Sequence, residues 1–209
     1  MTGPEERSSS LMPDTELSDA EVIRRARSDP GFFSTLFDRH APALHQYVTR
    51  RLGDSLADDV VAETFLAAFS RLGHYDTAHR DARPWLYGIA ANIVGKHRRT
   101  EVRAYRALAR TGVDEVAESY ADRVESRVSA GAAQRELASA LAALSPRDRE
   151  VLLMVAWADF SYEEVAGALG IPVGTVRSRL HRARKKTRAA LGGVDPSAAV
   201  SEEEPGRGR

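Results

Sequence analysis

Hydrophobic residues recur at helical spacing along most of this chain, and no stretch alternates apolar and polar positions as a β-strand does. Ser18, followed three residues later by Glu21, has the pattern of a capping box and predicts a helix through Val22, Ile23 and Ala26. The pattern predicts a protein built from helices.

The N-terminal part of the chain predicts four more helices. The first is expected to begin at Asp29-Pro30, where proline occupies a favoured first helical position, and the second to stop near Gly53. The third is capped by Asp54 or Ser55, and the fourth begins at Pro84. Their apolar positions are, in order, Phe32, Phe33, Leu36 and Phe37; Leu44, Tyr47, Val48 and Leu52; Leu56, Val60, Phe65, Phe69 and Leu72; and Trp85, Ile89 and Ile93.

The C-terminal part predicts a helix with Leu137, Leu141 and Leu144 on its apolar face, then a capping box at Ser145 and Asp148. A short helix follows, again with a capping box, formed by Ser161 and Glu164, and an apolar stripe of Val165, Ala168 and Leu169. Gly170 can end it in a left-handed conformation, and Pro172 opposes its continuation. A second helix then starts after a tight turn.

This second helix is strongly basic. One side repeats Val176, Leu180, Ala183 and Thr187 at spacings of four, three and four, so that side is expected to pack inward. Between Ile171 and Leu191 there is no acidic residue, and the cationic residues are Arg177, Arg179, Arg182, Arg184, Lys185, Lys186 and Arg188. A short capped helix, a turn and a basic helix predict a helix-turn-helix whose second helix binds a polyanion.

The charge of the chain is segregated, although its formal net charge is zero. A basic stretch at 80–106 and the basic C-terminal helix are separated by an acidic stretch at 114–125. We expect an all-α protein with two small helical domains, at 18–104 and 136–191, joined by a flexible acidic linker at 105–135. The tails at 1–17 and 192–209 are rich in polar residues, Pro, Ser, Gly or Glu, and are expected to be disordered.

Composition excludes several classes of site. The chain has no cysteine, so a disulfide framework and a thiolate metal site are impossible. No apolar run approaches the roughly 20 residues that cross a bilayer, and the N-terminus lacks the pattern of a signal peptide. We therefore expect a cytoplasmic protein.

The order of these parts resembles a known family. An acid-faced helix, DDVVAETFLAAF, precedes a polar loop, the segment PWLYGIAANIVGKHRR, a linker and the helix-turn-helix. Over about residues 20–191 the chain resembles the extracytoplasmic-function group of bacterial sigma-70-type RNA polymerase sigma factors. The resemblance implies that 18–104 corresponds to region 2, which recognises the promoter −10 element, and 136–191 to region 4, which recognises the −35 element.

Recognition of the −35 duplex requires donors near the start of the basic helix, where side chains reach base edges in the major groove. The residues expected to do this are Thr175, Arg177, Ser178, His181, Arg182 and Lys185, of which Lys185 is expected to contact mainly phosphate. An ordinary solvated cationic face is the alternative. The seven cationic residues of this helix, with no acidic residue among them, favour DNA binding over a solvated face.

Promoter melting requires stacking surfaces for single-stranded bases and a positive track for the backbone. By resemblance, the loop 74–83 would enclose a flipped non-template base and the helix after it would face DNA. The candidate −10 residues are His74, Tyr75, Arg80, Arg83, Asn92, Lys96, Arg98 and Arg99. Trp85 is expected to anchor the core, and the aromatic and histidine residues of the loop have an alternative reading as ordinary loop residues.

The acidic residues Asp58, Asp59 and Glu63 gather on one side of a predicted helix. By resemblance, this face would dock on the clamp helices of the largest polymerase subunit, while region 4 would bind the flap of the second-largest. A helical-bundle metal site with His40 and His45 is a weaker alternative, because the repeated Glu-x-x-His pattern is missing. A solvated helix face is the third reading.

No glycine-rich phosphate loop or nucleophile elbow is present, so we expect no catalytic site and no cofactor. The resemblance implies a non-catalytic specificity subunit that directs core RNA polymerase to promoter DNA, and a possible anti-sigma partner. The main rival is a stand-alone regulator that uses the same helix-turn-helix, and a helical metal-dependent hydrolase is a distant third.

Overall fold

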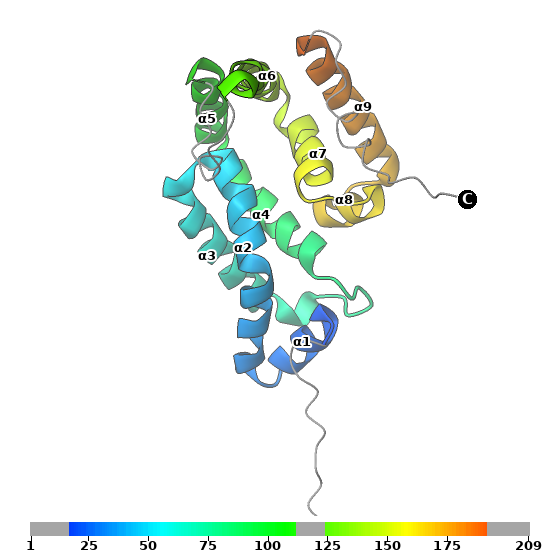
Figure 1. Ribbon diagram of the computed structural model, residues 1–209. Helices are drawn as coiled ribbons and strands as arrows, with labels where there is room; N and C mark the ends of the chain where they lie inside the picture. The colour runs from blue at the N-terminus through cyan, green and yellow to red at the C-terminus, as the bar shows by residue number, and fades with distance from the viewer. Residues whose placement is uncertain (1–16, 112–123, 192–209) are drawn as a thin grey trace, which may run out of the picture.

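The computed structural model describes residues 17–111 and 124–191, and these residues form α-helices, two short 3₁₀ turns and connecting loops, without a strand. The expected disorder of the tails and the centre of the expected linker lie outside the described residues. Figure 1 shows two groups of helices side by side, α1 to α5 in one and α7 to α9 in the other, with α6 lying across one end of both. We call the two groups the N-terminal half and the C-terminal half.

The N-terminal half begins with α1 (Asp19–Ala26), whose N-cap Ser18 accepts a hydrogen bond from the backbone N–H of Glu21. After a 3₁₀ turn at Pro30–Phe32, α2 (Phe33–Leu52) runs as one helix of 20 residues. The two helices predicted here are therefore one. Pro42 lies inside α2, and packing of Leu36, Leu44 and Val48 in the core holds the helix together across it.

Helix α3 (Asp54–Ser70) packs against α2 and α4 (Arg83–Lys96). Its N-cap is Gly53, which adopts a positive φ of 85°, and no side chain caps it; the predicted caps Asp54 and Ser55 lie inside the helix. Phe69, predicted to be buried, is 40% exposed. Small buried residues, Ala57, Thr64 and Ala68, turn a different face of α3 toward its neighbours.

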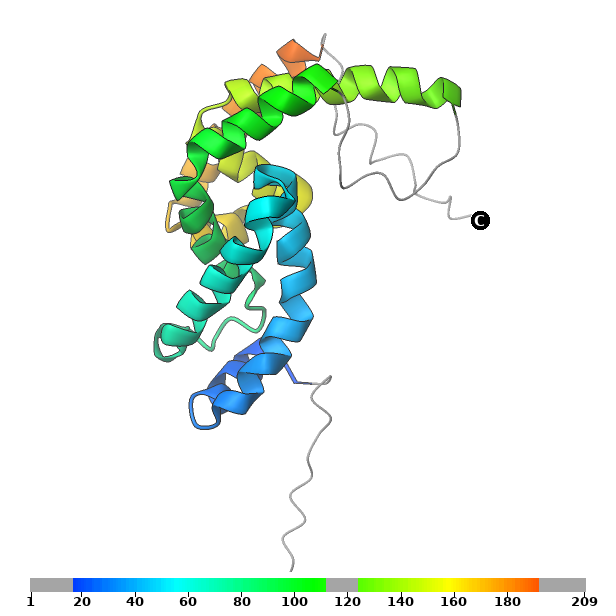
Figure 2. The ribbon, with the colours of Figure 1, turned by 90° about the vertical axis from the view of Figure 1, so that its left-hand side faces the viewer.

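The predicted linker contains helix at both ends. Helix α5 (Arg98–Thr111) follows α4 after a one-residue break, and α6 (Val124–Ala143) packs against α5 and α9. Figure 2 shows the N-terminal end of α6 extending away from the other helices. An acidic stretch therefore separates two helices that touch each other, and the boundaries that we predicted for the domains remain an expectation.

The C-terminal half is the part that local sequence signals predicted best. Ser145 caps α7 (Pro146–Trp157), and a complete capping box between Ser161 and Glu164 opens α8 (Tyr162–Leu169). Gly170 ends α8 with a φ of 61°, and α9 (Val173–Ala190) follows. Val176, Leu180, Ala183 and Thr187 are all buried, so the predicted inward stripe of α9 and the all-helical fold class are confirmed for the described residues.

None of the described helices is long and apolar enough to cross a membrane.

Candidate nucleic-acid interface

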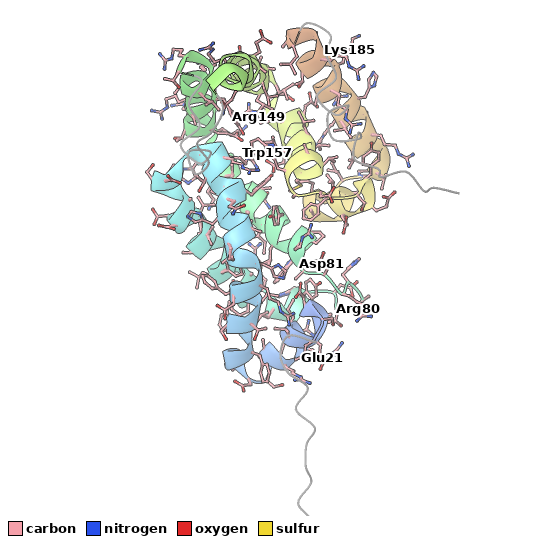
Figure 3. The ribbon with its side chains drawn as sticks, in the orientation of Figure 1. Glu21, Arg80, Asp81, Arg149, Trp157 and Lys185 are labelled. Atoms are coloured by element: carbon pink, nitrogen blue, oxygen red, sulfur yellow. The ribbon has the colours of Figure 1, made fainter. Side chains whose placement is uncertain are left out.

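The outer face of α9 presents the candidate −35 residues. Its buried stripe packs against α6, α7 and α8, which leaves Arg177, Ser178, His181 and Lys185 exposed while Thr175 is partly covered. The side chain of Lys185 points outward from α9 in Figure 3. The first turns of the helix thus offer donors to a ligand, and no carboxylate of the described residues forms an ion pair with these side chains.

Arg182 differs from its neighbours because it also has a partner inside the protein. One of its Nη atoms donates to Oδ1 of Asp148 at 3.0 Å, and Asp148 lies in the first turn of α7. Burial raises the pKa of Asp148, but hydrogen bonds from Arg182 and Ser145 outweigh it and bring the pKa below its usual value. Arg182 therefore fixes α9 against α7, and about half of its side chain stays exposed.

The loop before α4 has a defined shape set by Tyr75. This residue is 6% exposed, and its hydroxyl donates to the carbonyl oxygens of His79 at 2.7 Å and Asp81 at 3.2 Å. Its ring contacts Trp85 with 4.9 Å between centroids. Burial and the nearby Asp19 raise the pKa of Tyr75 to about 12, so its hydroxyl stays protonated. Tyr75 is thus placed to shape the loop.

The remaining candidate −10 residues are spread over the loop, α4 and the start of α5. His74, Arg80, Asn92, Lys96, Arg98 and Arg99 are exposed, and Arg80 points away from the body in Figure 3. Arg83 is held by the C-terminal half: it donates to the carbonyl oxygen of Ala158 at 2.8 Å and lies over the ring of Phe160. The Nζ atom of Lys96 is 2.6 Å from the Oε1 atom of Glu63 on α3.

Helix α5 carries exposed basic residues in addition to the predicted −10 candidates Arg98 and Arg99. Arg103, Arg106 and Arg110 are exposed and continue the line of Arg99, because residues three and four apart share a helix face. The only acid of α5, Glu101, is buried and faces the other way. The spacing of these arginines was visible in the sequence, but the loss of clean periodicity after residue 107 hid the helix.

The outer face of α3 carries Asp58, Asp59 and Glu63, all exposed. Two apolar side chains of the same helix are also exposed: Leu66 at 70% and Phe69 at 40%. Asp59, Glu63 and Leu66 follow one another at spacings of four and three, and together with the exposed Asp58 and Phe69 they form the outer stripe of α3. This outer stripe mixes acidic and apolar side chains, which is typical of a protein-binding face.

The geometry does not support the alternative of a metal site formed by His40, His45 and the acidic residues of α3. His45 contacts Asp58 with 3.0 Å between Nε2 and Oδ1, whereas His40 lies 2.8 Å from Asp19 on α1. Among the residues that the structure describes, no group of three or more histidine and carboxylate side chains could hold a metal ion. Asp19 instead ties the half together, since its carboxylate also accepts from Arg39 and from the backbone N–H of Ala82.

Comparisons with known proteins agree with these two regions. The family model for sigma-70 region 2 matches residues 36–111, and that for sigma-70 region 4 matches residues 134–187. The chain is 33% identical over 173 residues to the ECF RNA polymerase sigma factor SigL of Mycobacterium tuberculosis, a match that covers 82% of this chain and 96% of SigL. It is also 33% identical over 183 residues to the RNA polymerase sigma factor NccH of Alcaligenes xylosoxydans xylosoxydans, covering 86% and 97%.

A solved structure is similar as well. The structure of CnrH in complex with the cytosolic domain of CnrY aligns with a TM-score of 0.58 at 30% identity, covering 83% of this chain and 97% of that chain. The sigma factor RpoE of Bartonella quintana, solved with the anti-sigma factor NepR, aligns with a TM-score of 0.54 at 23% identity, which supports the fold alone.

Proposed function

The chain belongs to the extracytoplasmic-function group of sigma-70-type RNA polymerase sigma factors and directs transcription initiation, and from this premise we propose which of its surfaces does what. Region 4 at 136–191 reads the −35 duplex, region 2 at 18–104 holds the melted −10 strand and binds core polymerase, and the protein has no catalytic site of its own. Its place of action is the cytoplasm, where the polymerase works.

The single observation that carries the −35 assignment is the two-sided character of α9. One side is a fully buried apolar stripe, and the other bears cations without an acid between Ile171 and Leu191. A helix anchored in this way can enter the major groove, and arginine can donate two hydrogen bonds to guanine O6 and N7. Arg177, Ser178 and His181 are the proposed base readers, with Thr175, Arg182 and Lys185 beside them.

For the −10 strand, we propose that His74, Arg80 and Arg83 of the loop and Asn92, Lys96, Arg98 and Arg99 beyond it contact DNA. Tyr75 is assigned a positioning role, because its buried hydroxyl is occupied by two loop carbonyls. The strip of Arg99, Arg103, Arg106 and Arg110 on α5 extends this track by about 16 Å at 1.5 Å per residue. It suits the phosphates of the duplex upstream of the −10 element.

For core polymerase, we propose the outer stripe of α3 as the docking face. Asp58, Asp59 and Glu63 supply charge that meets a basic partner surface, and Leu66 and Phe69 supply apolar area to bury. The apolar pair was missed in the sequence because Phe69 fits a buried stripe and Leu66 is an ordinary helix residue. Their exposure is the stronger argument, since exposed large apolar side chains beside each other favour binding.

An anti-sigma protein is a further proposed partner. CnrH, which is 30% identical to this chain, was solved with the cytosolic domain of CnrY. A partner of this kind must cover surfaces that core polymerase or promoter DNA requires, and the outer stripe of α3 and the face of α9 are the natural targets.

The test of this function is transcription itself. The purified chain is mixed with core RNA polymerase on a fragment library of the source genome, and transcription starts are mapped. Starts that depend on the chain and share paired −35 and −10 elements support the proposal and give the consensus. Sequence-specific duplex binding by the chain without any association with polymerase would instead indicate a stand-alone regulator.

A further inference from the structure

Four cationic side chains from four helices line one cleft of the molecule, which we call the four-cation cleft. It has a volume of about 550 Å³ and lies where α4 and α5 face α7, α8 and α9 (Figure 1). The cations are Lys96 of α4, Arg98 of α5, Arg147 of α7 and Arg179 of α9. Because these residues come from distant parts of the chain, only the folded molecule brings their charges together.

The one acid among the residues that line the cleft, Glu150, is already neutralised. Its two carboxylate oxygens accept from the two Nη atoms of Arg51 on α2, each at 2.7 Å. The Nε atom of Arg51 donates to Glu101 of α5 at 2.8 Å, and Arg149 of α7 donates to the other oxygen of Glu101 at 2.8 Å. This buried network has two positive and two negative charges, so it does not cancel the charge of the four cations.

The four cations are largely free to bind a ligand. The side chains of Arg147, which is exposed, and Arg179, which is partly covered, make no ion pair or hydrogen bond within the described residues. Arg98 uses its Nε atom to donate to the carbonyl oxygen of Gly95 at 3.0 Å. Lys96 pairs with Glu63 across an exposed surface, where an ion pair contributes little and yields to a stronger partner.

The chemistry of the cleft fits a small anion that carries several charges. Guanidinium groups donate two parallel hydrogen bonds to a phosphate, and three of the four cations are arginines. A volume of about 550 Å³ lies within the range of roughly 300–1,000 Å³ that is typical of small-molecule sites. Duplex DNA, whose major groove alone is about 12 Å wide, is too broad to enter such a cleft.

The residues that line the cleft include no aromatic side chain, so it offers phosphate contacts without a stacking surface for a base. We propose that the four-cation cleft binds the chain of phosphates of a small oligophosphate, either free or as part of a nucleotide. Asn92 also lines the cleft, and Asn92, Lys96 and Arg98 are residues that we propose for the −10 strand. A bound oligophosphate therefore competes with promoter DNA. This consequence rests on the proposed function, whereas binding of the oligophosphate does not.

Binding is measured by calorimetry on the full chain without polymerase, with sodium tripolyphosphate as the probe at about 0.15 M salt. Arg147→Gln and Arg179→Gln are each expected to weaken binding roughly tenfold, because a charge-assisted hydrogen bond is lost. Arg184→Gln is the matched control: it removes the same charge from an exposed position of α9 outside the cleft, and it should keep the affinity of the parent. Circular dichroism checks that each variant stays helical.

Two results would overturn the proposal. One is an equal loss of affinity in Arg184→Gln, and the other is equally tight binding of citrate, a trianion without phosphate; either would mean unspecific attraction to a basic surface. A nucleoside triphosphate without magnesium is titrated in parallel to distinguish the source of the phosphates. Equal affinity for both probes, lost alike in Arg147→Gln, supports recognition of the phosphate chain alone, and tighter binding of the nucleotide supports a nucleotide ligand.

A competition experiment tests the consequence for DNA. A dye-labelled non-template strand that carries the −10 element of a mapped start is bound to the chain, and tripolyphosphate is added while anisotropy is followed. Arg147 has no proposed DNA contact, so Arg147→Gln should bind the strand as the parent does but need about tenfold more tripolyphosphate to release it.

The opposite pattern, weaker strand binding by Arg147→Gln with unchanged affinity for tripolyphosphate, would place the cleft in the DNA surface and overturn the proposal. Failure of the proposed function has a different signature. In that case neither protein binds the strand, while calorimetry still separates Arg147→Gln from Arg184→Gln.

Discussion

The two helices that we propose as DNA-binding elements, α9 and α4, differ in what covers them. The face of α9 that carries Arg177, Ser178 and His181 is open to solvent. Helix α4 instead has most of its surface buried, and part of that burial comes from α8 of the other half. The proposed −35 surface is thus exposed in this structure, whereas most of the helix proposed for the −10 element is covered.

The difference follows from what each helix is made of. Helix α9 is half apolar stripe and half cation, so its outer face can pack against protein only where carboxylates pair with its cations. Helix α4 has small and apolar residues around most of its circumference, including Gly88, Ala90 and Ala91, and its surface accepts another helix backbone.

The largest effect is expected from a substitution on the exposed face of α9. Arg177→Ala is expected to remove about 1–3 kcal/mol of recognition, or roughly 5- to 150-fold in promoter binding by the holoenzyme, because a bidentate contact to guanine is lost. The loss should depend on the −35 sequence, and core binding should be unchanged. Arg184→Ala, an exposed cation on the same helix, is the matched control. A loss of core binding in Arg177→Ala would contradict the −35 assignment.

Arg182→Ala should give a mixed result, because Arg182 also holds Asp148. The substitution is expected to weaken promoter binding and also to lower the melting temperature of region 4. Asp148→Asn separates the two roles, since it weakens the contact with α7 without removing the guanidinium from α9. Melting by circular dichroism and promoter binding by the holoenzyme, measured on the same proteins, check both expectations.

A next, smaller effect is expected on the side that binds polymerase. Asp59→Arg combined with Leu66→Ala reverses one charge and removes one exposed apolar side chain of the outer stripe of α3. About 1 kcal/mol from each change gives roughly 30-fold weaker association with core, which titration by anisotropy measures. Glu136→Arg, an equal charge reversal at an exposed position of α6, should leave association unchanged. Unchanged association of the double variant would mean that the α3 face is merely solvated.

The sequence predicted those features of the fold that depend on residues close together along the chain. The helix-turn-helix was predicted in detail because its capping box, Gly170 and the stripe of α9 are local and lie within 31 residues of each other. The single long α2 was missed because the gap in apolar spacing between Phe37 and Leu44 suggested two helices, whereas the helix continues across it. Phe69 was misplaced because small residues such as Ala57 and Ala68 give few cues to the buried face.

The interface between the halves could not be predicted, because its residues lie far apart along the chain. Arg51, Glu101, Arg149 and Glu150 look like ordinary surface charges of their helices, and nothing near them in sequence shows that they meet. Arg51 and Glu150 are 99 residues apart along the chain. Burial of a charge is decided by its partners in space, so it follows from the fold and is not visible in a local pattern.

A further prediction concerns the basic strip on α5, formed by the exposed residues Arg99, Arg103, Arg106 and Arg110. Replacing Arg103 and Arg106 by alanine removes two candidate phosphate contacts. The slope of log K against log salt for promoter binding should become shallower by about 1.8, because each contact contributes about 0.9. Arg24→Ala is the control, since Arg24 is exposed on α1 and forms an ion pair with Glu21. An unchanged slope would remove α5 from the DNA track.

The smallest effect is expected at Tyr75, and it separates loop shape from DNA contact. Tyr75→Phe loses hydrogen bonds to the carbonyls of His79 and Asp81, which should cost about 1 kcal/mol of unfolding free energy at neutral pH. The folded-state pKa of Tyr75 is raised from 10.0 to about 12, so the fold favours the neutral phenol. Its contribution is present below pH 10 and is lost as the pH rises toward 12.

Denaturant unfolding of both proteins from pH 7 to pH 12 therefore checks two things at once. The parent should lose stability relative to Tyr75→Phe as the pH rises from 10 to 12. The difference in unfolding free energy between the two proteins should therefore be smaller at pH 12 than at neutral pH. Transcription from a chain-dependent start measures whether the loop still works. Because a phenylalanine ring can still stack on a base, normal transcription with lowered stability supports a positioning role for the hydroxyl, whereas lost transcription with unchanged stability indicates that the hydroxyl itself contacts DNA.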